Sequence, residues 1–238
     1  MALDGLKKRL SYLDRMGIQL WVSRHRKESF QAGSSQPSVR EPMLSRADKI
    51  ANLGWSALRA EVSACQACEL YKSRTNPVFG VGNQTARLLI IGEAPGAHED
   101  KQGEPFVGRG GQLLTNMLLA IGIKREEVYI ANILKSRPPS NRDPLPEEVS
   151  ACTPFLLRQI SLIKPRLILA VGRVAAYFLL GSKQQPMASL RGRLFHYGTT
   201  NIPLLVTYHP AYLLRAPKEK RKAWQDLQCV KQQLNQSN

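Results

Sequence analysis

Polar and aromatic side chains suited to chemistry on a flat ring follow the ends of short aliphatic runs. The segment LLIIGEAPGAHEDKQGEPFVG, residues 88–108, places Glu93 and Phe106 directly after such a run, and Asn132 and His209 stand at the ends of two later ones. A phenylalanine ring can stack on a flat ligand, and an asparagine amide offers both donors and an acceptor to the edge of a pyrimidine or purine. A histidine can donate a hydrogen bond to charge that develops on a leaving group.

Glycines allow a ligand close to the backbone of the first of these loops. Gly92 and Gly96 leave the main chain open, and Pro95 supplies a rigid bend. The loop lacks the lysine of a P-loop and the spacing of a dinucleotide fold, which disfavours phosphate binding. Taken singly, each of these residues also has a purely structural interpretation. A strand-end asparagine commonly caps a turn, a lone histidine is more often structural than catalytic, and a phenylalanine more often belongs to the core. Their convergence on one edge of one sheet favours a site.

Aliphatic segments alternate with helical patterns in the region that must position these side chains. This alternation predicts an α/β fold with a mostly parallel sheet covered on both faces. Ligands bind such sheets outside the carboxyl ends of the strands. We predict strands over 87–92, 127–134, 166–172 and 202–210, and helices over 110–122, 146–163, 173–181 and 217–235. The strand ends select the loops 92–106, 132–141, 172–173 and 209–215.

Positive charge is concentrated in the second half of the chain. The formal net charge is +16, and residues 151–238 carry 13 Lys or Arg against two acids. Such a field favours a polyanionic partner, although a merely soluble basic surface is the alternative. The chain contains no apolar run of the roughly 20 residues that a spanning helix needs, so we expect no membrane partner and a cytoplasmic location.

Three segments resemble the uracil-DNA glycosylase superfamily, most closely its bacterial and archaeal family 4. They are GEAPGAHEDKQGEPFVGRGGQLL (92–114), NILKSRPPSNRDP (132–144) and HPAYLLR (209–215), within a resemblance that spans about residues 50–230. The resemblance implies an αβα sandwich around a central four-stranded parallel sheet. It also implies DNA containing uracil as substrate, hydrolysis of the bond between uracil and deoxyribose, and association with the bacterial nucleoid.

The resemblance also implies roles for individual residues. Phe106 would stack on a flipped-out uracil beside Gly92, Asn132 would bind its polar edge, and His209 would stabilise the departing anion. Chemistry on a base requires this extrusion from the stack. The pocket and the attacking water would be supported by Glu93, Glu99 and Asn141, and DNA would be contacted by Arg137, Pro210, Ala211, Tyr212, Leu213, Leu214 and Arg215.

Cysteine content departs from the family pattern at one position. Members of family 4 usually hold an iron–sulfur cluster on four cysteines, and Cys65, Cys68 and Cys152 match three of them. The fourth position is Ser136, and Cys229 lies too far along the last helix to replace it. A serine ligand, a three-iron cluster and buried thiols with no cluster all stay open.

The N-terminal segment is of a different kind from the rest of the chain. Residues 1–23 have the apolar spacing of an amphipathic docking helix, residues 24–44 are typical of a flexible linker, and residues 45–238 form the glycosylase-like domain. The stretch YLDRMGIQLWVSR resembles the peptide by which the psi subunit of bacterial DNA polymerase III attaches to the clamp loader. This resemblance implies clamp-loader subunits as partners, bound through Trp21.

Two functions are compatible with these features. One is a uracil-DNA glycosylase recruited to the replication machinery by its N-terminal helix. The other is a non-catalytic adaptor subunit of the clamp loader built on a glycosylase fold. The joint presence of Glu93, Phe106, Asn132 and His209 favours the enzyme, because a scaffold has no physical need for that set.

Overall fold

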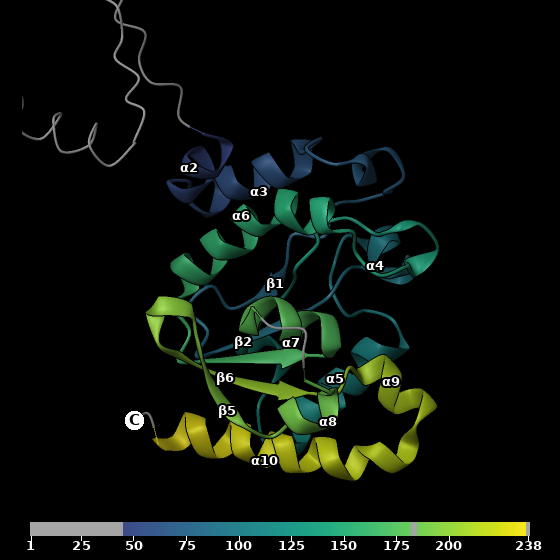
Figure 1. Cartoon of the computed structure of the whole chain (residues 1–238), viewed down its shortest axis with the longest axis vertical. Coiled ribbons are helices and arrows are strands. Elements are labelled where there is room, and N and C mark those ends of the chain that lie inside the picture. Colours follow the sequence, from purple (N-terminus) through teal and green to yellow (C-terminus); the bar gives the residue numbers. More distant parts are fainter. Residues whose placement is uncertain (1–44, 182–184, 237–238) are drawn as a thin grey trace, which may run out of the picture. The chain divides into compact units, whose positions relative to one another are not determined.

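The computed structural model of the chain describes residues 45–181 and 185–236 (Figure 1). The predictions made for residues 1–23 and 24–44, including Trp21, lie outside these residues. None of the described helices is long and apolar enough to cross a membrane.

A mixed six-stranded sheet forms the centre of the described region. Its strands are β1 (Val81–Gly82), β2 (Leu88–Gly92), β3 (Tyr129–Asn132), β4 (Leu167–Val171), β5 (Leu194–Tyr197) and β6 (Ile202–Thr207). Their order is β1-β3-β2-β4-β6-β5. The pairs β3–β2, β2–β4 and β4–β6 are parallel, whereas β1 and β5 add antiparallel to the two edges.

Strands β2 and β4 are buried at every residue, as expected for strands covered on both faces. Alternate residues of β2 therefore enter two different cores. Leu89 and Ile91 pack with α6 and α7, while Leu88 and Ile90 pack with α5 and α10. Figure 1 shows α6 on one side of the sheet and α10 on the other. The arrangement is helix, sheet, helix.

The helices differ in length and in how they begin. The α-helices are α2 (Arg46–Ala51), α3 (Trp55–Ala64), α4 (Ala97–Gln102), α5 (Arg109–Ala120), α6 (Pro146–Ile163), α7 (Arg173–Leu180), α8 (Met187–Leu190), α9 (Pro210–Arg215) and α10 (Lys220–Gln236). Single 3-10 turns are η1 (Glu69–Lys72), η2 (Arg125–Glu127), η3 (Pro139–Asn141), η4 (Gly198–Thr200) and η5 (Pro217–Glu219). Proline stands in the first turn of α6 and α9, where its missing N–H costs no helical hydrogen bond.

The α/β class is confirmed, and β3, β2, β4 and β6 pair in parallel at the centre of the sheet. The sequence did not indicate the two antiparallel edge strands, because β1 has only two residues and β5 alternates exposed and half-exposed side chains. Neither edge strand gives a buried aliphatic run. The last predicted strand was also too long: β6 ends at Thr207, and Pro210 begins helix α9.

Candidate functional site

A pocket of about 570 Å³ opens at the carboxyl edge of the sheet. It collects side chains that follow three different strands: Glu93 after β2, Asn132 at the end of β3, and His209 after β6. Phe106, from the loop between α4 and α5, completes the set. The wall also includes Glu99, Arg109, Pro138, Asn141, Arg142, Asp143, Ala211, Tyr212 and Arg215. The four residues on which the sequence prediction depended therefore share one cavity.

Phe106 is held in an unusual backbone conformation. Its φ of 55° lies in the left-handed region, which costs a side-chain-bearing residue energy unless its surroundings impose it. Its ring stacks on the His209 imidazole, with centroids 5.5 Å apart and an interplanar angle of 30°. A Cβ at Gly111, in the first turn of α5, would lie 1.8 Å from the Phe106 carbonyl oxygen. Glycine there lets α5 approach the strained residue.

Glu99 fixes the loop that carries Phe106. Its Oε1 accepts hydrogen bonds from the backbone N–H groups of Val107 and Gly108, both at 3.0 Å, and its Oε2 accepts from Gly96 at 3.1 Å. One of these donors lies just before α4 and the other two lie just before α5. Glu99 therefore fixes the shape of the pocket wall.

Asn132 presents an unpaired acceptor. The residue is 2% exposed, yet its Oδ1 has no hydrogen-bond partner among the residues that the structure describes. Buried polar atoms of native proteins are rarely left unpaired, so an exception inside a cavity points to a ligand donor. The opposite residue in the parallel register is Gly92. A Cβ at Gly92 would lie 2.4 Å from that Oδ1, so glycine keeps the acceptor accessible.

Lys135 supports Asn132 from behind, and sequence reasoning missed it. The side chain is 1% exposed. Its Nζ donates to the Asn132 carbonyl oxygen at 2.9 Å and to Gln159 Oε1 at 2.7 Å, and Gln159 in turn donates to the Phe79 carbonyl oxygen. Burial lowers the pKa of Lys135 to about 7. Charge alone gives no signal for a buried lysine, because lysine is normally exposed.

His209 is the N-cap residue of α9, and this sets its tautomer. Its Nδ1 accepts a hydrogen bond from the Ala211 N–H at 3.2 Å. Burial first, and the nearby Arg215 second, lower the pKa of His209 to about 4, although Glu99 acts in the opposite direction. The imidazole is therefore neutral near pH 7. With Nδ1 accepting, its proton lies on Nε2, which leaves one donor.

A second buried network anchors the strand that leads to His209. Thr207 Oγ1 donates to Asp226 Oδ2 at 2.8 Å, and Arg191 pairs with the same carboxylate through Nε at 3.1 Å and Nη2 at 2.5 Å. Asp226 is 0% exposed. This network uses one of the two acids of the basic half of the chain. Sequence reasoning counted Asp226 only as charge.

Glu93 is half-buried beside charged residues of the pocket rim. Burial first, and the neighbouring Asp143 second, raise the pKa of Glu93 to about 7, while Arg173 lowers it. Arg173 also pairs with Asp143, at 3.0 Å. A carboxyl that titrates near neutral pH can accept a proton from a water molecule at the site.

The other predicted site residues divide between the rim and the core. Asn141 lies on the exposed rim, where its Oδ1 accepts from Arg137 Nε at 2.8 Å. Tyr212 is 38% exposed and lines the pocket together with Arg215. Leu213 is 1% exposed and packs in the core with α5 and α10, and Pro210 is also buried. Helix α9 therefore turns Pro210 and Leu213 toward the core, and DNA contact through them stays a prediction.

The predicted cluster ligands lie at another place, between α6 and the segment that follows α3. Cys68 packs against the apolar core that contains Cys152, while Arg46 Nη2 donates to Cys65 Sγ at 3.4 Å. At the fourth position the Ser136 hydroxyl accepts from Arg74 Nη1 at 3.0 Å. In the part of the chain that the structure describes, no three Cys, His, Asp or Glu residues form a metal-holding group. This donor set does not fit a four-thiolate cluster.

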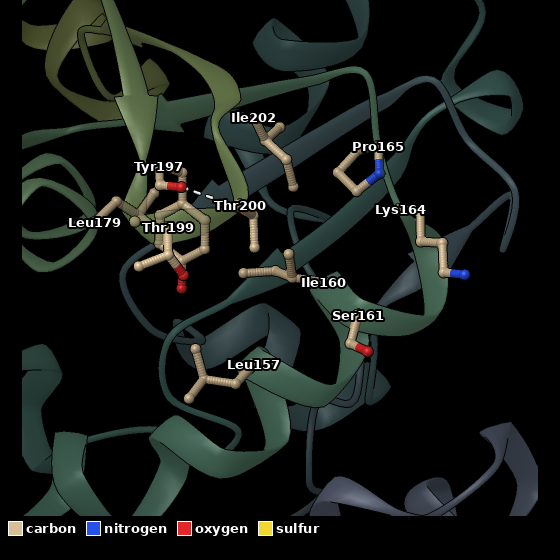
Figure 2. Close-up of a pocket in the computed structure, with 11 residues that line it drawn as sticks. Leu157, Ile160, Ser161, Lys164, Pro165, Leu179, Tyr197, Thr199, Thr200 and Ile202 are labelled. Carbon is tan, nitrogen blue, oxygen red and sulfur yellow. Dashed lines mark hydrogen bonds between the residues drawn. The ribbon is translucent and has the colours of Figure 1, made fainter.

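A larger hollow lies at the opposite edge of the sheet and contains none of the predicted site residues. Figure 2 shows its lining, which includes Leu157, Ile160, Tyr197 and Ile202. Its volume is about 690 Å³. Lys164 is the only charged residue in this lining, so it brings together no acid with a base. Glu93, Phe106, Asn132 and His209 lie in the smaller pocket instead.

A pocket at the carboxyl edge of an α/β sheet that combines a phenylalanine, an asparagine and a histidine is typical of a protein that binds a flat ring, and comparison with known proteins gives the family. The family model of the Uracil DNA glycosylase superfamily matches residues 79–228, and this chain belongs to that superfamily.

Relatives within the superfamily include several type-4 enzymes. The Type-4 uracil-DNA glycosylase of Thermotoga maritima is 49% identical over 65% of this chain and 80% of its own length. The Type-4 uracil-DNA glycosylase of Archaeoglobus fulgidus is 42% identical over 71% of this chain and 88% of its own length. A Type-5 uracil-DNA glycosylase of Pyrobaculum aerophilum is more distant, with 27% identity over 65% of this chain and 74% of its own length.

Proposed function

We propose that this protein is a uracil-DNA glycosylase that takes uracil out of the DNA stack and hydrolyses its N-glycosidic bond. The observation that carries the proposal is the unpaired Asn132 Oδ1, aimed into a pocket that also holds Phe106 and His209. The similarity to type-4 uracil-DNA glycosylases supports the choice of base.

Two buried side chains, Asn132 and Phe106, recognise the base. Asn132 offers its free Oδ1 to the N3–H of uracil and its amide N–H to a neighbouring carbonyl oxygen, a pattern that the amino group of cytosine does not match. The Phe106 ring supplies a flat apolar surface for the base. Because Phe106 and Asn132 are both buried, their positions are set before the base enters.

His209 stabilises the leaving group. A water oxygen bonds to C1′ of the deoxyribose, the bond from C1′ to uracil N1 breaks, and uracil departs as an anion. The neutral imidazole donates Nε2–H toward the charge that develops on the base. One preorganised donor of this kind contributes about 3–4 kcal/mol of barrier lowering.

Glu93 receives the proton that the attacking water loses, either directly or through a second water. Its raised pKa of about 7 makes it a stronger base than an ordinary carboxylate and leaves it largely ionised above neutral pH. Asn141, Arg137, Tyr212 and Arg215 lie on the rim, where they are placed to contact the DNA backbone on either side of the extruded base.

A single-uracil oligonucleotide tests this function. We expect the purified protein to release uracil, and we expect His209→Ala and Asn132→Ala to lower the rate at least 100-fold. His196→Ala and Asn235→Ala are matched controls, because both residues are exposed and lie outside the pocket. If the unmodified protein binds uracil-containing DNA but releases no base, the glycosylase proposal is wrong.

Recruitment to a clamp loader is a separate proposal that depends on sequence alone. The psi-like stretch around Trp21 lies outside the described residues, and its charge and apolar spacing are its only support. Trp21→Ala should reduce capture of purified clamp-loader subunits while leaving uracil release unchanged. If the Trp21→Ala protein and the unmodified protein capture these subunits equally well, the proposal of a clamp-loader partner is wrong. A non-catalytic adaptor would require that uracil release is absent.

A further inference from the structure

The four positions that correspond to cluster ligands each have a partner within this chain. Cys65, Cys68, Ser136 and Cys152 are called here the thiol–serine group. We infer that protein contacts, centred on Arg74 and Arg46, hold this group together in place of a four-thiolate iron–sulfur cluster. The inference concerns the stability and metal content of the protein, and it does not depend on the proposed glycosylase activity.

Arg74 binds Ser136, the residue at the fourth position. It follows η1 in the chain, and its guanidinium donates from Nη1 to Ser136 Oγ at 3.0 Å and from Nη2 to the Ser63 carbonyl oxygen at 2.9 Å. One side chain therefore joins the end of α3 to the loop after β3. Ser136 is 3% exposed, so its hydroxyl is held inside the protein. A hydrogen bond from a charged donor contributes more than one between neutral groups.

Arg46 makes the corresponding connection at Cys65. Its Nη2 donates to Cys65 Sγ at 3.4 Å, and its Nη1 donates to the Ala151 carbonyl oxygen in α6 at 2.8 Å. The same guanidinium lies over the Phe155 ring, 4.9 Å from its centroid. Helix α2 is thereby attached both to the first cysteine and to α6.

The two remaining thiols pack in the same apolar core. Cys152 belongs to the core that also contains Leu70 and Leu134, and Cys68 packs against that core. Cys152 is 4% exposed. This packing brings together η1, α6 and the loop after β3. Each member of the thiol–serine group is therefore held by another segment of the same chain.

An apolar core lies beside this group. Ile50, Leu58 and Val62 from α2 and α3 form a core with Phe79 and Phe155. Arg158 adds a bond from Nε to the Leu53 carbonyl oxygen, and Arg59 stacks over the Phe79 ring, 4.5 Å from its centroid. This core, together with the arginine bonds, attaches α2 and α3 to α6.

The chemistry of the fourth position also opposes a cluster. Protein ligands of such clusters are normally thiolates, and a ligand must give up its proton to bind metal. A serine hydroxyl is neutral near pH 7, and here it already accepts from a guanidinium that cannot be deprotonated. Ser136 therefore matches a structural hydrogen bond better than it matches an anionic ligand.

Metal analysis of three full-length proteins tests the inference. We expect the unmodified protein, expressed and purified without oxygen, to contain far less than one iron per chain and to show no visible absorbance band. Ser136→Cys restores a fourth thiol, and we expect it to take up about four iron atoms per chain when supplied with iron and sulfide. Cys65→Ser in the Ser136→Cys background should abolish this uptake.

Thermal unfolding of the iron-free protein tests the arginine contacts. Arg74→Met removes two hydrogen bonds and should lower Tm by about 5 °C, and Ser136→Ala, which removes one, should lower it by less. Arg221→Met is the matched control, because Arg221 is exposed on α10 and far from the group, and its Tm should not change.

Two results would overturn the inference. The first is equal iron content, whether high or low, in the unmodified and Ser136→Cys proteins. The second is a Tm for both Arg74→Met and Ser136→Ala that matches the Arg221→Met control. An iron-free protein that is stable but releases no uracil would instead contradict the proposed function and leave this inference standing.

Discussion

Gly92 and Asn132 face each other across the parallel pair β2–β3, and the absence of a side chain at the first residue is what frees the amide of the second. A Cβ atom added at Gly92 would lie 2.4 Å from Asn132 Oδ1 and 2.7 Å from Cζ of the Phe106 ring. Both contacts are shorter than real Cβ contacts. The site therefore depends on the absence of a side chain at Gly92.

Gly92→Ala should damage activity more than stability. The methyl group displaces the Asn132 amide and the Phe106 ring, which can each move at the cost of their alignment. We expect kcat/KM for uracil release to fall 10-fold to 100-fold, which corresponds to about 1.4–2.7 kcal/mol. Gly54→Ala is the control, because nothing lies within 4 Å of its built Cβ. Activity equal to that of the control would show that Asn132 is not the base-reading group.

The pH dependence of uracil release should reflect Glu93. Its pKa is raised to about 7, so the ionised form that accepts a proton increases as pH rises through 7, and kcat should increase with it. Glu93→Gln should give a low rate that does not change between pH 6 and 8. A Glu93→Gln profile that still rises through pH 7 would assign the titration to another group.

At the pH values at which ionised Glu93 supports activity, it should also lower the stability of the folded protein. Because its folded pKa lies above the unfolded value, the folded state keeps the proton longer, and stability falls as pH rises from about 4.5 to about 7. Glu93→Gln removes that loss. Urea unfolding at pH 8 should therefore show the variant to be more stable than the unmodified protein, and a less stable variant would contradict the direction of the shift.

Glu99→Ala should loosen the loop that holds Phe106. The change removes the acceptor of three backbone N–H groups, at Gly96, Val107 and Gly108. We expect the free energy of unfolding to fall by about 2 kcal/mol and KM for uracil-containing DNA to rise. Glu126→Ala, an exposed glutamate in η2, provides the control. An unchanged KM would mean that the Phe106 loop keeps its shape without Glu99.

Lys135→Met should remove a pH dependence of stability. The folded pKa of Lys135 is about 7 and the unfolded value about 10.5, so between these limits the unfolded state binds more protons. Stability should therefore rise with pH over this range, by up to a few kcal/mol, since each pKa unit corresponds to about 1.4 kcal/mol. Denaturant unfolding at pH 7, 8 and 9 measures this slope.

Lys135→Met should abolish the slope, whereas the exposed Lys124→Met should keep it. The variant also loses the bond from Nζ to the Asn132 carbonyl oxygen, so kcat should fall while the increase of kcat through pH 7 that Glu93 causes stays in place. A slope that is unchanged in Lys135→Met would mean that another group causes it.

The order of strands and helices was largely available from the sequence, and the two edge strands were not. Fully buried strands such as β2 and β4 are continuous aliphatic runs, and β4 is followed directly by α7, a helix with its own apolar spacing. The edge strand β5 has four residues and leaves Leu194 and His196 exposed, so it gives no continuous buried run. Edge strands gain their structure from one neighbour, β6 in this case, rather than from burial.

The sequence by itself determined which residues stand at the carboxyl ends of the strands, because alternation and the parallel-sheet rule place Glu93, Asn132 and His209 at one edge. Only the tertiary structure decided how they are held. The bond from Lys135 to Gln159 and the contact between Thr207 and Asp226 join residues 24 and 19 positions apart, and Arg191 reaches Asp226 across 35. Local patterns report the burial of a face, but pairing between distant polar side chains depends on the packing of helices against the sheet. For the same reason, the sequence shows Ser136 only as a position that lacks the expected cysteine, whereas the fold shows its hydrogen bond with Arg74.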